Sequence, residues 1–181
     1  MSSLISTYLS SPSLHLPPLV TLYLVILHYL PLNPFLTRKL VHTGCGYMIM
    51  RLLPAEPLDR HFVYAVSLAS ILMTWLPNSP VKFRFTRPSD VGVTAYLLIV
   101  SAWFYLRMDP TVLGPVFFAD PAGAVVGKAM SRLGFNARWH GGTSKTVLGT
   151  AAVFVVTYFT ASCGEAVELR LGTAAAAAVV E

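Results

Sequence analysis

The stretch TVLGPVFFADPAGAVVGKAM, residues 111–130, decides the fold, because it is an apolar run of 20 residues that contains one acidic side chain, Asp120. A helix of about 20 residues spans the hydrocarbon core of a bilayer. A carboxylate at that depth costs about 2.5–3.5 kcal/mol on insertion scales, so such groups usually face a cavity, an ion or a partner. We therefore expect a membrane helix with a functional Asp120; a packed ion pair with Lys128 or Lys145 is the alternative.

Further apolar runs lie on both sides of this stretch. Hydrophobic residues make up 55% of the chain and charged residues only 12%, whereas a soluble domain has about 25% charged residues. Backbone polar groups in lipid have to be satisfied inside helices. We therefore predict an all-α fold, a polytopic transmembrane bundle of about 6–7 helices, with residues 1–181 as a single integral membrane domain. The other runs are Leu14–Leu32, Leu40–Leu53, Phe62–Leu76, Val91–Leu106, Val147–Cys163 and Leu169–Val180.

The basic residues divide unequally between the two sides that alternating loops would occupy. Nine of the thirteen fall on one side, and four, offset by five acidic residues, fall on the other. The positive-inside rule makes the nine-residue side cytoplasmic, or stromal in a plastid. The net charge of +5 then reflects topology and contacts with anionic lipid or nucleotide, so we expect no nucleic-acid partner. The nine are Arg38, Lys39, Lys82, Arg84, Arg87, Lys128, Arg132, Arg138 and Lys145.

The N-terminal segment and the two cysteines give little evidence about targeting or metal binding. No Arg or Lys precedes Arg38, which argues against a secretory signal and against an Arg-rich transit peptide. The Ser-rich start, Met1 to Ser13, keeps a plastid location open. Cys45 and Cys163 lack metal-ligand spacing, so we expect both to pack in helices.

A basic motif, Arg38-Lys39-Leu40-Val41-His42, precedes the second apolar run. Arg38 and His42 stand four residues apart and share a helix face. Three nitrogen-donor side chains at a membrane surface are suited to gripping phosphates. The alternative is a basic flank that fixes the position of a helix in the membrane.

Small residues recur every four positions around Asp120, at Ala119, Gly123 and Gly127. This spacing lets two helices approach closely, so we expect Gly123 and Gly127 to lie against another helix. A glycine-lined path for a nucleotide is the alternative interpretation.

The segment Gly141-Gly142-Thr143-Ser144-Lys145-Thr146 precedes the run that begins at Val147. Exposed N–H groups at a helix start attract phosphate, and Lys145 adds a positive charge. The spacing differs from that of a P-loop, and no strand precedes the segment. A capped helix start with Lys145 extending toward the membrane surface is the alternative.

Together these motifs resemble the phytol kinase, dolichol kinase and yeast-type diacylglycerol kinase group, which is related to phosphatidate cytidylyltransferases. The resemblance rests on Arg-Lys-x-x-His, on an Asp followed by a Gly/Ala-rich helix, and on Lys-Thr-x-x-Gly-Thr. It spans about Thr37 to Thr150, most specifically from Ala119 onward. It implies a multi-helix membrane fold, CTP as phosphoryl donor, a lipid alcohol as acceptor and a divalent cation, usually Mg²⁺.

The resemblance also implies roles for matching residues. Asp120 and His42 are the expected catalytic residues, with the general base open between them, and Asp120 is the expected metal ligand. Leu148 stands where many relatives have Glu or Ala, so the lipid remains open between phytol, farnesol, dolichol and diacylglycerol. The expected nucleotide-binding residues are Arg38, Lys39, Gly127, Lys145, Thr146, Gly149 and Thr150.

The resemblance leads to further expectations about location and geometry. We expect a multi-pass protein of the endoplasmic reticulum or a plastid membrane, with the site on the cytosolic or stromal side. Asp120 and Lys145 should face one pocket there, with Arg38, Lys39 or His42 close by. The family continues past Glu181, so we expect the chain to be a C-terminally truncated member.

Two other functions remain as alternatives. A phosphatidate cytidylyltransferase would use CTP too, but it usually carries an Asp-rich signature after His-Gly-Gly. Here His140-Gly141-Gly142 is followed by Thr143-Ser144-Lys145. A small transporter or a membrane scaffold would use Asp120 as an ion or proton site.

Overall fold

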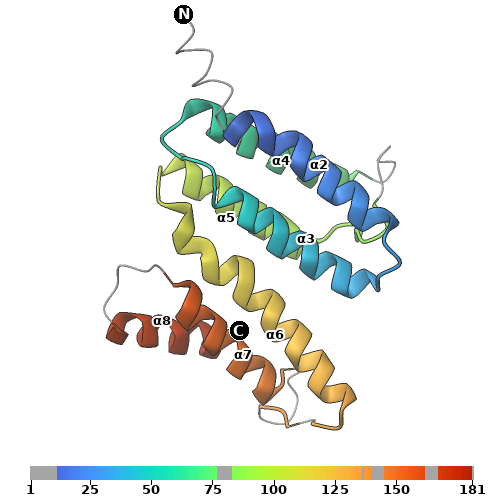
Figure 1. The fold of residues 1–181 in the computed structure, drawn as a ribbon, viewed down its shortest axis with the longest axis vertical. Coiled ribbons are helices and arrows are strands. Elements are labelled where there is room, and N and C mark those ends of the chain that lie inside the picture. Colours follow the sequence, from blue (N-terminus) through green and yellow to red (C-terminus); the bar gives the residue numbers. More distant parts are fainter. Residues whose placement is uncertain (1–11, 77–82, 136, 140–144, 162–166, 181) are drawn as a thin grey trace, which may run out of the picture. The chain divides into compact units, whose positions relative to one another are not determined.

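The computed structural model describes residues 12–76, 83–135, 137–139, 145–161 and 167–180, which form helices connected by short turns (Figure 1). The predicted all-α class is confirmed. Within these residues the extended structure is limited to an isolated bridge between Arg138 and Thr146. The helices are α2 (Pro12–Tyr29), α3 (Pro34–Ile49), α4 (Pro57–Trp75), α5 (Val91–Tyr105), the 3-10 turn η1 (Pro110–Leu113), α6 (Gly114–Arg132), α7 (Val147–Thr160) and α8 (Val167–Val180).

Capping residues explain where the helices begin. The Asn33 side chain accepts a hydrogen bond of 2.9 Å from the N–H of Phe35, and Pro34 occupies the first position of α3. Asp90 caps α5 in the same way by accepting from the N–H of Val93. The α3 helix therefore starts six residues before the predicted run at Leu40. That shift places Arg38 inside a helix rather than in the preceding loop.

The chain divides into two compact units. The first contains α2, most of α3, α4 and α5. The second contains the short α3 segment His42–Tyr47 together with residues 111–181, and so with α6, α7 and α8. Each unit is described by itself below.

In the first unit, α4 and α5 form a helical hairpin. The indole N–H of Trp75, at the end of α4, donates to the hydroxyl of Thr94 at the start of α5, over 2.9 Å. Arg84, which precedes α5, reaches the end of α2: its backbone N–H donates to His28, and its guanidinium donates to the carbonyl oxygens of Leu30 and Leu32. The ends of α2 and α4 and the start of α5 therefore share one end of this unit.

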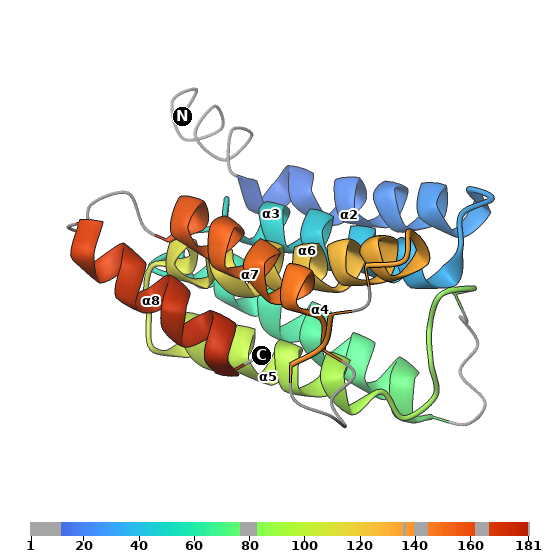
Figure 2. The ribbon, with the colours of Figure 1, turned by 90° about the horizontal axis from the view of Figure 1, so that it is seen from below.

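In the second unit, α7 packs along α6 and α8 returns along α7, as Figures 1 and 2 both show. The buried side chains of this unit include Phe117 on α6, Val153 on α7 and Ala174 on α8. A Cβ added to Gly114, at the start of α6, would lie 2.8 Å from the carbonyl oxygen of Thr160, at the end of α7. The two helices are therefore antiparallel and in close contact at this end.

One helical segment of the described residues, Pro110–Arg132, is long and apolar enough to cross a membrane. It contains the 111–130 stretch on which the fold prediction began. Three shorter apolar segments accompany it, namely Leu14–Tyr29, Val91–Tyr105 and Val147–Thr160. The multi-pass arrangement stays a prediction.

Candidate functional site

His42 lies beside the turn of α6 that precedes Asp120. Its ring nitrogen Nε2 is 3.0 Å from the carbonyl oxygen of Val116. Because a carbonyl oxygen only accepts, Nε2 is the donor, and in the neutral ring Nδ1 is then the acceptor nitrogen. Val116 and Asp120 stand four residues apart on α6, so they lie on the same side of the helix. Two of the predicted site residues are thus brought to one region of the second unit.

A glycine on α3 allows this approach. A Cβ added to Gly46, one turn after His42, would overlap the ring of Phe117, which is fully buried. Phe117 therefore fills the space that a larger residue at position 46 would need. This contact and the His42 hydrogen bond hold the α3 segment His42–Tyr47 against α6.

Asp120 belongs to the face of α6 that crosses α7. It stands three residues before Gly123 and seven before Gly127, the spacing of residues on one helix face. Its side chain is half-buried. Pro121 follows it inside the helix and has no N–H to give to the carbonyl of Phe117. The backbone next to Asp120 thus has one helical hydrogen bond fewer than a regular helix.

The prediction that Gly123 and Gly127 lie against another helix is confirmed. A Cβ added to Gly127 would lie 2.7 Å from the hydroxyl oxygen of Thr146, and one added to Gly149 would lie 3.0 Å from the carbonyl oxygen of Gly123. Thr146 also caps α7, because its hydroxyl accepts from the N–H of Gly149 over 3.1 Å. Three residues of the predicted nucleotide site, Gly127, Thr146 and Gly149, therefore make structural contacts with one another.

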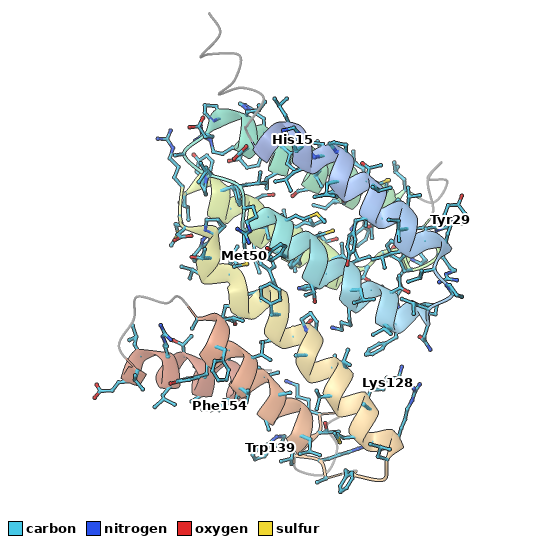
Figure 3. All side chains as sticks on the ribbon, viewed as in Figure 1. His15, Tyr29, Met50, Lys128, Trp139 and Phe154 are labelled. Atoms are coloured by element: carbon cyan, nitrogen blue, oxygen red, sulfur yellow. The ribbon has the colours of Figure 1, made fainter. Side chains whose placement is uncertain are left out.

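Lys145 and Thr150 flank this crossing. Lys145 is exposed immediately before the cap of α7. The hydroxyl of Thr150 accepts from the indole N–H of Trp139 over 3.0 Å, and Figure 3 shows Trp139 beside the first turn of α7. Residues Gly141–Ser144 of the predicted phosphate-binding segment lie outside the described residues. The N-terminus of α7 thus carries an exposed lysine next to the residues where α6 and α7 cross.

The distance between the two halves of the predicted site is set by α6. Asp120 lies about two helical turns, roughly 10 Å, from Gly127, where the start of α7 packs. Asp120 is also nearer to the start of α6 at Gly114 than to its end at Arg132.

Arg38 and Lys39 belong to the first unit, and both are half-buried on α3. Burial lowers the pKa of Arg38 below its ordinary value, the charge of Arg87 lowers it further, and Asp90 acts in the opposite direction. The guanidinium groups of Arg38 and Arg87 thus repel one another within this unit. The predicted approach of Arg38 and Lys39 to Asp120 stays a prediction.

Two residues that sequence reasoning did not select contribute to the second unit. Trp139 holds the segment before α7 through Thr150, and Thr157 is a fully buried polar residue on α7. A lone Trp in a polar segment and a Thr in an apolar run carry no recognisable spacing. Only the packing of the helices reveals them.

Comparison of the chain with protein-family models, with curated proteins and with solved structures gives no match.

Proposed function

We propose that the protein is a multi-pass membrane kinase that transfers the γ-phosphate of CTP to a lipid alcohol. The single observation that carries the proposal is the hydrogen bond from His42 to the carbonyl of Val116, because it brings a potential base within one turn of Asp120. The resemblance of the motifs to the lipid-alcohol kinase group indicates CTP as the phosphoryl donor and a lipid alcohol as the acceptor. The exposed Lys145 at the start of α7 supplies a positive charge for phosphates.

The surface supports a lipid environment. Large apolar side chains are exposed along most helices of both units, whereas a soluble monomer rarely exposes contiguous apolar patches of more than a few hundred Å². Lipid contact removes the cost of that exposure, since the helices satisfy their own backbone groups. Examples with exposed fractions of 50% or more are Leu22, Leu68, Leu98, Val155 and Phe159.

The proposed reaction forms one bond and breaks one. The oxygen of the lipid alcohol attacks the γ-phosphorus, the bond to the β-phosphate oxygen breaks, and CDP leaves with the electron pair. The alcohol proton passes to Nδ1 of His42, the acceptor nitrogen of the ring when Nε2 donates to Val116. Positioning and charge neutralisation supply most of the rate in phosphoryl transfer. Lys145 would contribute positive charge to that neutralisation, and Asp120 would contribute through the divalent cation that it would hold.

The carboxylate of Asp120 fits a cation that arrives with the nucleotide. Mg²⁺ is usually held by one or two carboxylates together with substrate phosphates and water. Among the described residues no group of three His, Cys, Asp or Glu side chains could hold a resident metal ion. Bound Mg²⁺ would neutralise charge on the phosphates, and Asp120 would orient it.

A labelling experiment tests the function. Membranes containing the full-length protein receive CTP labelled at the γ-phosphate and one alcohol at a time: phytol, farnesol, dolichol or diacylglycerol. We expect label in the lipid monophosphate of one alcohol, and none when ATP labelled in the same position replaces CTP. Label in no lipid would refute the kinase. In a parallel assay with phosphatidate and CTP labelled in the cytidine, transfer of label to the lipid would establish the cytidylyltransferase alternative.

A further inference from the structure

The end of the second unit at which α6 finishes and α7 starts carries only positive charge. Between Asp120 and Glu165 the sequence has four Lys or Arg residues and no Asp or Glu. All four basic side chains are exposed. They are Lys128, Arg132, Arg138 and Lys145, and they define the basic end of the second unit. This stretch of chain therefore has no acidic side chain of its own to neutralise them.

A turn at Gly134 ends α6 and exposes apolar side chains beside the basic ones. Gly134 has a φ of +92°, and the N–H of Phe135 donates to the carbonyl oxygen of Met130 over 3.0 Å, the pattern of a glycine C-cap. The turn comes two residues after Arg132, the last residue of α6. Leu133 and Phe135 are 70% and 59% exposed. Two large apolar side chains therefore adjoin the basic end in the chain.

Contacts bring the start of α7 to the same end of the unit. Arg138 forms the isolated antiparallel bridge with Thr146. A Cβ added to Gly127 would lie 2.7 Å from the hydroxyl oxygen of Thr146. Lys128 follows Gly127 in the chain, and Lys145 precedes Thr146. The basic residues of α6 and those before α7 therefore belong to one region of the surface.

Trp139 adds an aromatic ring to this region. Its backbone N–H donates to the carbonyl oxygen of Lys145 over 3.4 Å, and its indole N–H donates to the hydroxyl of Thr150 over 3.0 Å. The side chain is nevertheless 48% exposed. Figure 3 shows Trp139 and Lys128 toward the same end of the second unit. A tryptophan with a bonded N–H and an exposed ring is typical of the boundary between membrane and water.

This combination of side chains favours a membrane surface as the partner. Basic side chains close to an anionic membrane are attracted to its headgroups, and apolar side chains beside them are buried below the headgroups. Nucleic acid would also match the charge. However, α6 belongs to the segment Pro110–Arg132, which is long and apolar enough to cross a membrane. The end of that segment would lie where lipid headgroups meet water.

We propose that the basic end of the second unit docks on the headgroups of anionic phospholipids, with Leu133, Phe135 and Trp139 inserted just below the headgroups. No bond forms or breaks. The proposal rests on a membrane location but needs neither CTP nor Asp120. A failed kinase assay would therefore leave it standing, and a failed docking test would leave the kinase proposal standing.

Quenching of Trp139 fluorescence tests the docking. The full-length protein with Trp75→Phe and Trp103→Phe keeps Trp139 as its sole tryptophan. It is reconstituted into phosphatidylcholine bilayers in which an equal fraction of lipid is brominated phosphatidylcholine or brominated phosphatidylglycerol. We expect both lipids to quench Trp139, and the apparent affinity for phosphatidylglycerol to be at least about fivefold higher. If that protein misfolds, the difference in emission between the unaltered protein and Trp139→Phe gives the same quantity.

Matched variants locate the docking surface. Arg132→Gln combined with Arg138→Gln should lower the preference for phosphatidylglycerol roughly fivefold. Arg51→Gln combined with Arg107→Gln removes the same charge from exposed positions of the first unit and should leave the preference unchanged.

Three results would overturn the proposal. They are equal quenching by the two lipids, quenching by neither, and an unchanged preference after the Arg132 and Arg138 substitutions. Binding of single-stranded RNA to the detergent-solubilised protein is measured in parallel. RNA binding that is lost in the same double variant, without any lipid preference, would assign this surface to nucleic acid instead.

Discussion

The imidazole Nε2 of His42 lies 3.0 Å from the carbonyl oxygen of Val116, a residue 74 positions away in the chain and one turn before Asp120. The bond joins the histidine of a basic motif to the helix that carries the half-buried carboxylate. Because the carbonyl oxygen only accepts, Nε2 is the donor in this bond, and Nδ1 is the acceptor nitrogen of the neutral ring. Two residues selected for chemical reasons thus lie near the same stretch of α6 within one compact unit.

We predict that His42→Ala lowers the rate of CTP-dependent lipid phosphorylation about 100-fold, the usual contribution of a general base. His61→Ala changes an exposed histidine of the first unit and should leave the rate unaltered. The rates are measured in membranes with equal amounts of protein. A His42→Ala variant with the unaltered rate would remove the histidine from the mechanism.

The glycine crossing of α6 and α7 should respond to a single methyl group. Gly149→Ala would place a Cβ 3.0 Å from the carbonyl oxygen of Gly123, which is backbone and cannot rotate away. We expect a loss of stability of about 1–3 kcal/mol, seen as a lower Tm in detergent. Gly172→Ala is the control, because its Cβ would meet nothing within 4 Å. Equal melting temperatures for the two variants would contradict the crossing.

Thr146 should act mainly as the cap of α7. Thr146→Ala removes the hydroxyl that accepts from Gly149, and we expect it to cost about 1 kcal/mol of stability. Thr146→Ser keeps the hydroxyl and should restore most of the stability. If thermal unfolding is the same for Thr146→Ala and the unaltered protein, the hydroxyl has no capping role.

The charged residues at the two ends of the first unit allow a prediction about membrane topology. Arg87 lies near the start of α5 and Glu56 immediately before α4, so roughly 28 Å of helix separates the two ends. In a protein without native cysteines, Arg87→Cys and Glu56→Cys should react with an impermeant thiol reagent from opposite sides of the membrane. Labelling after detergent treatment controls for accessibility. Reaction of both from the same side would contradict the positive-inside assignment.

Much of the helical fold was predictable, because long apolar runs that are bounded by prolines and charged residues favour helices over other secondary structure. The run Val91–Leu106 and helix α5, Val91–Tyr105, agree to one residue. The start of α3 was missed because the apolar run begins at Leu40, whereas Asn33 and Pro34 start the helix by capping it. Cap chemistry would have found that boundary.

For the candidate site, the sequence suggested residues but did not show how they pack. Spacing along the chain selected His42 and Asp120, and it foresaw the packing of Gly127. It did not show that the Thr146 hydroxyl packs against Gly127, or that the buried Thr157 hydroxyl has no hydrogen-bond partner among the described residues. Those facts depend on how α6, α7 and α8 pack, which local sequence does not specify.

The central claim is that Asp120 carries CTP-dependent phosphoryl transfer to a lipid alcohol, and one measurement tests it most directly. The rate of label transfer from γ-labelled CTP is compared for the unaltered protein, for Asp120→Asn, and for Asp109→Asn, which alters an exposed carboxylate outside the proposed site. Asp120→Asn keeps the size of the side chain and removes its charge, so we expect a loss of roughly 100- to 1,000-fold with unchanged membrane insertion and with Asp109→Asn fully active. A near-normal rate for Asp120→Asn would contradict the account.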